Sequence, residues 1–153
     1  MKFPARIPFI DKLGIELLKF DGGEAELAID TQEDLCNSWG VAHGGVVMTL
    51  LDVAMAHAAR SPLPPDPNRP PEQEVPEGRG VATIEMKTSF MRPGQGRLLA
   101  KAKVLHRTAA TVFCEASIFD TAGQIVAHAT GTFKCLKGLP AAGRQIMRPN
   151  ASD

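Results

Sequence analysis

The sequence predicts an α+β domain in which one long central helix is wrapped by a mostly antiparallel sheet. The helix is Gly44–Arg60, a run rich in Ala, Leu and Met that lacks proline and is apolar nearly all round, so most of its sides should be buried. Segments on both sides of it alternate apolar and polar residues or turn at glycine, as short strands do. The 153 residues are most simply one domain, 1–153.

The segments before the helix predict a helical turn and a hairpin. Residues 7–14, IPFIDKLG, can form one or two helical turns. Residues 15–30 are typical of two short strands around Asp21-Gly22-Gly23, because aspartate followed by glycine favours a hairpin turn.

The segments after the helix predict an exposed insertion and then strands. Ser61–Gly80 is dense in proline and acidic residues, so we expect an exposed loop, a solvated linker rather than a functional lid. Residues from about 137 onward should form a C-terminal tail. Strand-like patterns occupy residues 80–92, 96–108 and 110–136, the last with a hairpin turn at Asp120–Gly123.

Strict alternation assigns the side chains of residues 81–88 to two faces of the sheet. The odd-numbered residues share one face, which places Thr83 on the same face as Glu85 and Lys87.

A sheet wrapped around one helix leaves its outer face and its edges uncovered. We therefore expect a second copy of the chain to cover part of them.

Composition excludes several classes of partner. Seventeen Lys and Arg balance 17 Asp and Glu, so charge gives no reason to expect nucleic acid or an acidic membrane surface. The longest apolar run contains Asp52 and His57 and is too short and too polar to cross a bilayer. The three cysteines lack metal-ligand spacing, and the first residues lack the apolar core of a signal peptide. We expect reduced cysteines, no metal site and a cytoplasmic location.

Two glycines mark the start of the predicted helix. The first N–H groups of a helix have no intrahelical acceptor, and the helix dipole adds partial positive charge there. Without a side chain at Gly44 and Gly45, a ligand can approach these groups, and such a place can hold an oxyanion. The alternative is that both glycines only permit a tight turn and close packing.

Asp52 is the only acid of the helix. At 100° per residue it shares a stripe of small residues with Gly45, Ala56 and Ala59, and Thr49 lies beside that stripe. A carboxylate in such surroundings is a candidate general base or nucleophile. The alternative is a solvent-facing aspartate, or one neutralised by arginine or lysine.

The spacing of these groups predicts a shared site. Gly45 and Asp52 are seven residues apart, roughly 10.5 Å along a helix axis. Groups that act on one carbonyl carbon sit about 3 Å from it. Two antiparallel copies of the helix, packed across a dimer, would bring Asp52 of one chain to Gly45 of the other.

The pattern N-x5-HGG-x6-D, here Asn37, His43-Gly44-Gly45 and Asp52, resembles the hotdog-fold acyl-CoA thioesterases of the phenylacetate-degradation (PaaI-like) group. The stretches PFIDKLGIEL and TIEMKTSFMRPG resemble the same family, and the likeness runs from about residue 8 to residue 133. It implies a hotdog fold, a single long helix wrapped by a sheet.

The resemblance also implies roles for individual residues. Asp52 would activate water or attack the thioester carbon, and the Gly45 N–H would donate to the thioester oxygen. Asn37 would position the water or the carbonyl. His43 would support the loop and bond to the thioester, and the hydroxyl of Thr83 would orient the nucleophilic water.

Substrate binding is assigned to a second group of residues. Gly44 belongs to the helix start, and Trp39 either lines the acyl pocket or anchors its loop. Arg92 and Arg107 are candidates for the CoA phosphates, although the family's usual Gly-Arg or Gly-Lys is replaced here by HRTAAT. The remaining histidines, at 57, 106 and 128, are expected to be surface or packing residues.

The function expected from these residues is hydrolysis of an acyl-CoA thioester to a carboxylic acid and free CoA. We expect no metal or redox cofactor, and CoA counts as part of the substrate. The active unit would be a homo-oligomer, either a dimer or a dimer of dimers. Two alternatives stay open: a hydroxyacyl-thioester dehydratase, disfavoured because Gly-Gly rather than Pro-Gly follows His43, and a non-catalytic acyl-CoA-binding module. The acyl group cannot be read from the sequence.

Overall fold

A computed structural model describes residues 1–75 and 80–136 of the chain. The predicted tail from residue 137 and residues 76–79 of the insertion lie outside the described residues. The described helices and strands are α1 (Pro8–Leu13), β1 (Glu16–Asp21), β2 (Glu24–Asp30), α2 (Gly44–Arg60), β3 (Val81–Phe90), β4 (Arg97–Arg107), β5 (Thr111–Phe119) and β6 (Ile125–Cys135), with short 3-10 turns at Glu33–Leu35 and Pro71–Gln73.

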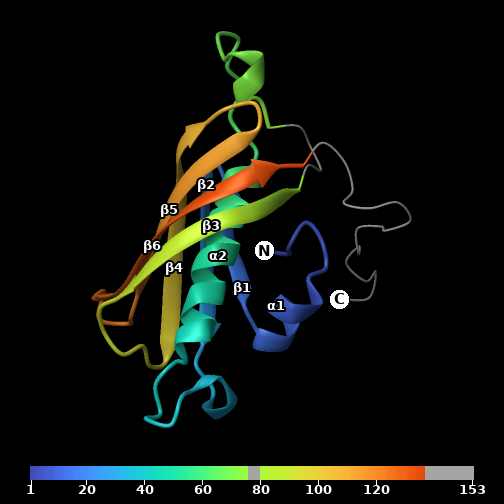
Figure 1. The fold of residues 1–153 in the computed structure, drawn as a ribbon. Coiled ribbons are helices and arrows are strands. Elements are labelled where there is room, and N and C mark those ends of the chain that lie inside the picture. Colours follow the sequence, from blue (N-terminus) through green and yellow to red (C-terminus); the bar gives the residue numbers. More distant parts are fainter. Residues whose placement is uncertain (76–79, 137–153) are drawn as a thin grey trace.

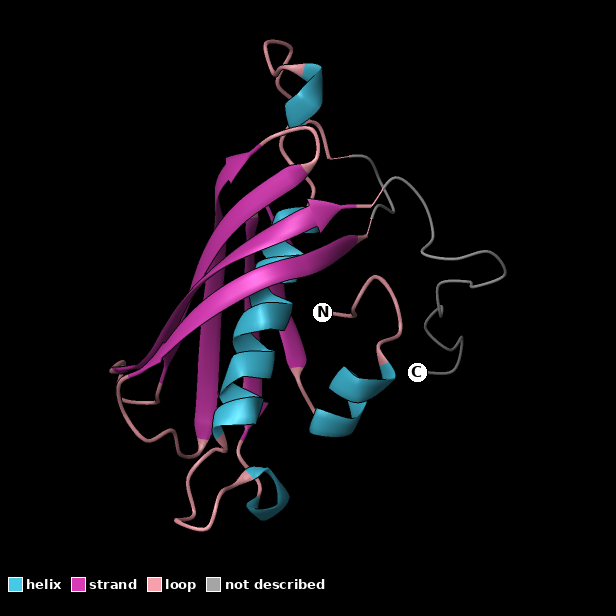
Figure 2. Cartoon of the chain, viewed as in Figure 1, coloured by secondary structure: helices cyan, strands magenta, loops and turns pink. Residues whose placement is uncertain are grey.

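The described strands form one six-stranded antiparallel sheet in the order β1-β2-β4-β5-β6-β3. The sheet curves around α2, so its two edge strands, β1 and β3, lie on opposite sides of the helix (Figures 1 and 2). The predicted α+β arrangement of one wrapped helix is confirmed, and α2 has the predicted bounds.

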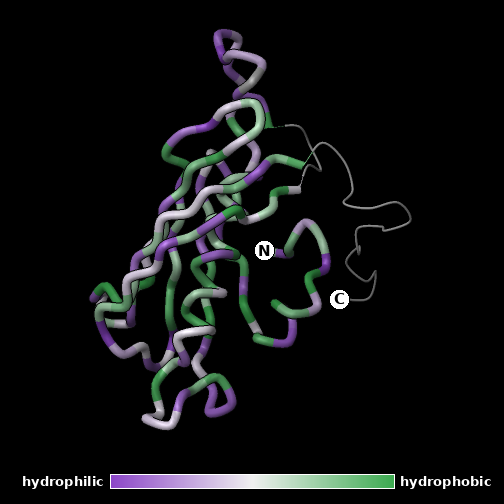
Figure 3. The backbone as a smooth tube through the Cα atoms, viewed as in Figure 1, coloured by the Kyte–Doolittle hydropathy of each residue, from purple (hydrophilic) through white to green (hydrophobic). Residues whose placement is uncertain are grey.

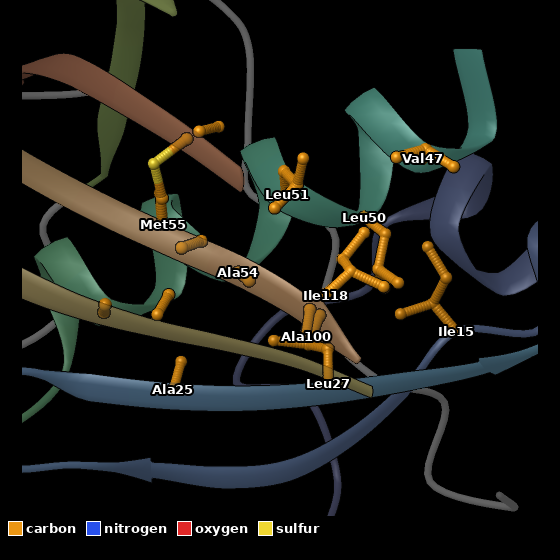
Figure 4. Close-up of a cluster of buried hydrophobic side chains, with 14 of the residues drawn as sticks. Ile15, Ala25, Leu27, Val47, Leu50, Leu51, Ala54, Met55, Ala100 and Ile118 are labelled. Carbon is orange, nitrogen blue, oxygen red and sulfur yellow. The ribbon is translucent and has the colours of Figure 1, made fainter. Parts of the chain in front are cut away.

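The core lies between α2 and the concave face of the sheet (Figure 4). The helix contributes large side chains such as Leu50, Leu51 and Met55, whereas the strands facing it are rich in alanine. A Cβ at Gly131 of β6 would lie 3.0 Å from the Met55 methyl group, so a side chain there would force Met55 to move. Small residues on the sheet thus allow the helix to pack close to it, and the strand alanines of this core are Ala25, Ala100, Ala102, Ala116, Ala127 and Ala129.

The connections agree with the predicted turns. Gly22 and Gly23 join β1 to β2 with φ angles of 64° and 79°, a region that favours glycine. The segment 62–75 extends beyond the sheet, is largely exposed and is mostly hydrophilic in colour in Figure 3. Its start is nevertheless fixed, because the buried Ser61 hydroxyl accepts a hydrogen bond from the Gly23 N–H at 2.8 Å.

Strict alternation fails at bulges in β3 and β4. The register of β3 shifts between Thr83 and Glu85, and that of β4 shifts between Val104 and His106. A bulge moves every later side chain to the opposite face. Thr83 therefore faces the helix instead of sharing the outer face with Glu85, and Arg107 turns into the interior; both corrections bear on the site.

Candidate active site

A short loop leads into the N-terminus of α2. Its two ends are joined by a β-bridge between Cys36 and Ala42. Inside the loop, the Asn37 side-chain oxygen accepts the backbone N–H groups of Trp39 and Val41, at 2.9 and 3.4 Å. The amide oxygen of Asn37 is therefore used to shape the loop, and its NH2 group is the part that can act on a substrate.

His43 is the N-cap residue of α2. Its ring atom Nδ1 accepts a hydrogen bond from the Gly45 N–H at 2.9 Å. The Gly45 N–H, predicted to donate to the thioester oxygen, thus already has an acceptor within its own chain. Its role as oxyanion donor stays a prediction that would require this bond to break.

Gly44 is the first residue of α2, and no described residue accepts a hydrogen bond from its N–H. A Cβ on Gly44 would lie 3.5 Å from the ring of Phe90, an ordinary contact. Phe90, at the end of β3, is 54% exposed. Phe90 adjoins the helix start. The stretch TIEMKTSFMRPG contains it but assigns it no role, and only its place on an edge strand beside the helix identifies it.

Asp52 lies two helical turns further along α2, on the side that faces β3. The Thr83 hydroxyl donates a hydrogen bond to Asp52 Oδ1 at 2.7 Å. Both residues were expected to act on the nucleophilic water, and the structure brings them together, with Thr83 in contact with the carboxylate itself. The β3 bulge makes this contact, since without it Thr83 would face outward. Asp52 Oδ2 is left to accept a proton.

One side of α2 remains uncovered in the single chain. Gly45 is exposed, Met48 is 39% exposed and Asp52 is partly exposed. Along the neighbouring edge strand, Ile84 is 57% exposed. This open face of α2 and β3 contains both parts of the candidate site, the helix start and the Asp52–Thr83 pair.

The predicted CoA-binding and pocket residues are placed differently. Arg107 is 9% exposed, and its guanidinium donates to the Ala59 carbonyl near the end of α2. It therefore lies at the far end of the helix from Gly44 and is buried rather than exposed, while its role with the CoA phosphates stays a prediction. Arg92 is exposed and stays a candidate. The Trp39 side chain is 86% exposed, so it does not anchor its loop by packing.

The histidines outside the motif are structural or peripheral. His57 is buried, with its ring edge-on to Phe3 and Phe20 and with Nδ1 2.8 Å from the Val53 carbonyl. Burial lowers the pKa of His57 to about 4. His106 is exposed and its ring stacks on that of Phe113. The His128 ring forms a hydrogen bond with the Ser117 hydroxyl at 2.9 Å.

Membrane-spanning helices and metal-binding clusters were both sought in the described residues, 1–75 and 80–136. No helix among them has the length and apolar character needed to cross a membrane. No cluster of three or more His, Cys, Asp or Glu side chains able to hold a metal ion is found in the same part of the chain.

Comparison with known proteins gives consistent relatives. A model of the thioesterase superfamily matches residues 40–127. A Halobacterium salinarum protein named as an esterase is 33% identical over 121 residues, which are 77% of this chain and 74% of that protein. The medium/long-chain acyl-CoA thioesterase YigI of Salmonella typhimurium is 26% identical over 135 residues, 86% of this chain and 87% of YigI.

A solved structure extends the likeness to the fold. A variant of the phenylacetic acid degradation protein PaaI from Thermus thermophilus superimposes with a TM-score of 0.70 and 26% identity, over 85% of this chain and 100% of that one.

Proposed function

Because this chain belongs to the thioesterase superfamily, we propose that it hydrolyses acyl-CoA thioesters to a carboxylic acid and free CoA. The chain is a thioesterase with the predicted hotdog fold. The acyl-CoA substrate is supported by its likeness to YigI, a medium/long-chain acyl-CoA thioesterase.

The observation that most strongly supports this proposal is the Asp52–Thr83 hydrogen bond on the open face of α2 and β3. Thr83 occupies Oδ1 and fixes the orientation of the carboxylate. In one version of the reaction, Oδ2 takes a proton from water as the water oxygen bonds to the carbonyl carbon. The C–S bond then breaks, and the CoA sulfur leaves with a proton. In the other version, an oxygen of Asp52 bonds to the carbonyl carbon, and the C–S bond breaks as the CoA thiolate leaves and takes up a proton. Water then cleaves the resulting anhydride, which releases the carboxylic acid and restores the Asp52 carboxylate.

The start of α2 would stabilise the negative charge that develops on the carbonyl oxygen. We assign this role to the Gly44 N–H, since the Gly45 N–H is bound by His43. The NH2 group of Asn37 lies in the loop before the helix and is a second candidate donor, because its oxygen is already used.

These groups belong to one helix but cannot serve one carbonyl. Gly44 and Asp52 are eight residues apart, about 12 Å along the axis, whereas catalytic groups sit about 3 Å from the atom on which they act. A site composed of Asp52 from one chain and Gly44 from another removes this difficulty. We therefore propose an active dimer with two shared sites.

The surface suited to this dimer is the open face of α2 and β3. β3 is a ten-residue edge strand whose outer backbone groups have no neighbouring strand within the described sheet. Such an edge pairs readily with another strand, and antiparallel pairing of two β3 strands is self-complementary. Ile84 and Phe90 would then be covered, and the two α2 helices would lie side by side.

The test is an assay of free thiol release from a series of alkyl- and aryl-CoA thioesters, with a thiol-reactive dye. We expect stoichiometric release of free CoA and carboxylic acid. Hydration or dehydration of the acyl chain without thiol release would support a dehydratase instead. Saturable binding without turnover across the series would support a binding module.

A further inference from the structure

The strand β3 contacts the helix α2 at two points, which belong to the two parts of the candidate site. At one point, the Thr83 hydroxyl donates a hydrogen bond to Asp52 at 2.7 Å. At the other point, the Phe90 ring lies against Gly44, since a Cβ on Gly44 would be 3.5 Å from Cε1 and 3.7 Å from Cζ of that ring. The carboxylate therefore has Thr83 beside it, and the helix start has the Phe90 ring.

The two β3 side chains in these contacts project from the same face of the sheet. Directly paired residues of antiparallel strands have their side chains on one face. Thr83 is paired with Phe133 of β6, and Phe90 is paired with Ala127 of the same strand. Phe133 and Ala127 both belong to the core between α2 and the sheet, so Thr83 and Phe90 face the helix.

The backbone at the end of β3 is held in place beside the helix start. The two residues after Phe90 donate their backbone N–H groups to the Val126 carbonyl, at 2.9 and 3.1 Å. Two residues further on, the Gly94 carbonyl accepts the Ala42 N–H at 2.8 Å, which joins this connection to the loop before α2. The Phe90 side chain therefore projects from a backbone whose position relative to the helix start is fixed.

Phe90 is exposed in the single chain although it faces the helix. Phe133, on the neighbouring strand and the same face, is fully buried. Met48 is also exposed, and it lies one helical turn from Gly44 on the same side of α2. The surface next to the Gly44 N–H is thus apolar and uncovered, as expected where an apolar group of a ligand is bound.

The proposed shared site brings the Phe90 ring to the reacting atoms. Within each chain, Phe90 accompanies Gly44 and Thr83 accompanies Asp52. A dimer that joins Gly44 of one chain to Asp52 of the other therefore also brings Phe90 of the first chain toward Thr83 of the second. A thioester oxygen bound by the Gly44 N–H would place the first carbons of the acyl group next to the ring.

The chemistry of the ring matches the acyl side of the thioester. The CoA side carries amides and phosphates, which need hydrogen-bonding or charged partners that a phenyl ring does not offer. An alkyl or aryl group gains by covering the ring, and each methylene group removed from water is worth up to about fourfold in a binding or rate constant.

We infer that Phe90 selects the acyl group: its ring contacts the carbons that follow the thioester carbonyl, so apolar acyl groups long enough to cover the ring are preferred over acetyl. This inference rests on the proposed thioesterase function and deepens it by naming a substrate class. Phe90 contributes its ring as a wall of the site and takes no part in proton transfer.

The first test compares the release of free CoA from acetyl-CoA and hexanoyl-CoA, whose acyl groups differ by four methylene groups. Phe90→Ala in the full-length protein should lower kcat/KM for hexanoyl-CoA at least about 10-fold more than for acetyl-CoA. Phe113→Ala is the matched control and should leave the ratio unchanged, because Phe113 is an exposed phenylalanine whose ring stacks on His106, away from α2.

A second variant covers the case in which Phe90→Ala disturbs folding or the dimer. Phe90→Leu keeps an apolar side chain at the proposed dimer surface and should lower the same ratio by a smaller factor, about 3-fold. Native mass spectrometry checks that the variants keep the oligomeric state of wild type. Equal losses on both substrates, or an unchanged ratio, in such variants would show that the ring does not contact the acyl group, which overturns the inference.

The third test needs no catalysis and uses two thioethers that cannot be hydrolysed, S-ethyl-CoA and S-hexyl-CoA. In calorimetry, wild type should bind S-hexyl-CoA at least about 10-fold more tightly, and Phe90→Ala should lose most of this preference. A preference that is the same in wild type and Phe90→Ala would contradict the inference. If wild type released no CoA from any thioester, the proposed hydrolysis would fail, while this binding measurement would still decide the role of Phe90.

Discussion

The two ends of α2 use their polar groups in different ways. At the C-terminal end, Arg107 donates to the Ala59 carbonyl and the buried Ser61 hydroxyl donates to the Ala58 carbonyl at 3.1 Å. One turn earlier the His57 ring bonds to the Val53 carbonyl. All three side chains are buried, and each of these hydrogen bonds stabilises the folded chain, although His57 Nε2 has no hydrogen-bond partner among the described residues.

The N-terminal half of the helix keeps polar groups with unused capacity. The Gly44 N–H has no acceptor among the described residues, and Asp52 keeps one oxygen after bonding to Thr83. The difference teaches that a polar residue near this helix is a candidate for chemistry only if the fold leaves part of it both unbound and accessible, a condition that the buried His57 does not meet. The predictions below test this division between a catalytic half and a structural half.

The largest effect is expected from the catalytic half, at Asp52. Asp52→Asn keeps the size of the side chain and can still accept from Thr83, but loses the carboxylate base, so kcat should fall by at least about 10²-fold. Steady-state release of CoA measures this. Asp30→Asn, on the outer surface, is the matched control and should retain activity. Near wild-type turnover in a pure Asp52→Asn sample would disprove the assignment.

In the structural half, His57 should make the protein sensitive to acid. The pKa of His57 is lowered to about 4 in the folded chain by burial, from 6.5. Between these values the unfolded chain binds the proton and the folded chain does not, so stability is lost as the pH falls from 6.5 to 4. The loss from this group is about 3 kcal/mol at most.

Denaturant titrations across this pH range measure the effect of His57. The variant His57→Leu has no ring to protonate, so its stability should decline less steeply than that of wild type. Parallel pH dependence in the two proteins would show that His57 is not buried in its neutral form.

Arg107 separates stability from substrate binding. Arg107→Met leaves the buried Ala59 carbonyl without its donor, so the free energy of unfolding should fall by about 2 kcal/mol. KM for acyl-CoA should stay within about 2-fold of wild type, as expected for a residue that does not touch the substrate. Arg92→Met, at an exposed position, is the control and should not change stability. A raised KM at unchanged stability in Arg107→Met would restore its predicted role with CoA.

Thr83 should show the smallest catalytic effect, because it acts through Asp52. Thr83→Val has nearly the same shape but no hydroxyl, and should lower kcat by about 10-fold by freeing the carboxylate to rotate. Thr83→Ser keeps the hydroxyl and should recover most of the activity. If Thr83→Ser were as slow as Thr83→Val, the hydrogen bond to Asp52 would not be the cause.

Much of the fold could be predicted from local patterns. The bounds of α2 follow from Gly44-Gly45 at its start and the proline-rich segment after its end, and the first hairpin follows from Asp21-Gly22-Gly23. The resemblance also assigned Asp52 and Thr83 to one site, and the structure brings the two side chains together in a hydrogen bond that the sequence did not predict.

The orientation of several side chains could not be predicted, because an alternating pattern of apolar and polar residues does not show where a strand has a bulge. A one-residue bulge before His106 turned Arg107 inward, and a second bulge turned Thr83 toward Asp52. The His43 ring accepts a hydrogen bond from the Gly45 N–H because the extended backbone of this N-cap residue directs the ring toward the first turn of the helix. These local details decide which polar groups remain free.

The most direct test of the shared site is complementation between two inactive chains. Asp52→Ala removes the acid. Gly44→Pro removes the N–H at the first helical position, where proline is well tolerated, and the ψ of 139° at His43 suits a following proline. Gly44→Ala keeps the N–H and is the control for added bulk.

Each inactive variant alone should release almost no CoA. After subunit exchange verified by native mass spectrometry, each heterodimer should contain one site with Asp52 from one chain and Gly44 from the other. An equal mixture should then recover about a quarter of wild-type activity, since about half of the dimers are mixed and each has one of two sites intact. Verified heterodimers without activity, or a fully active monomer, would contradict the shared site.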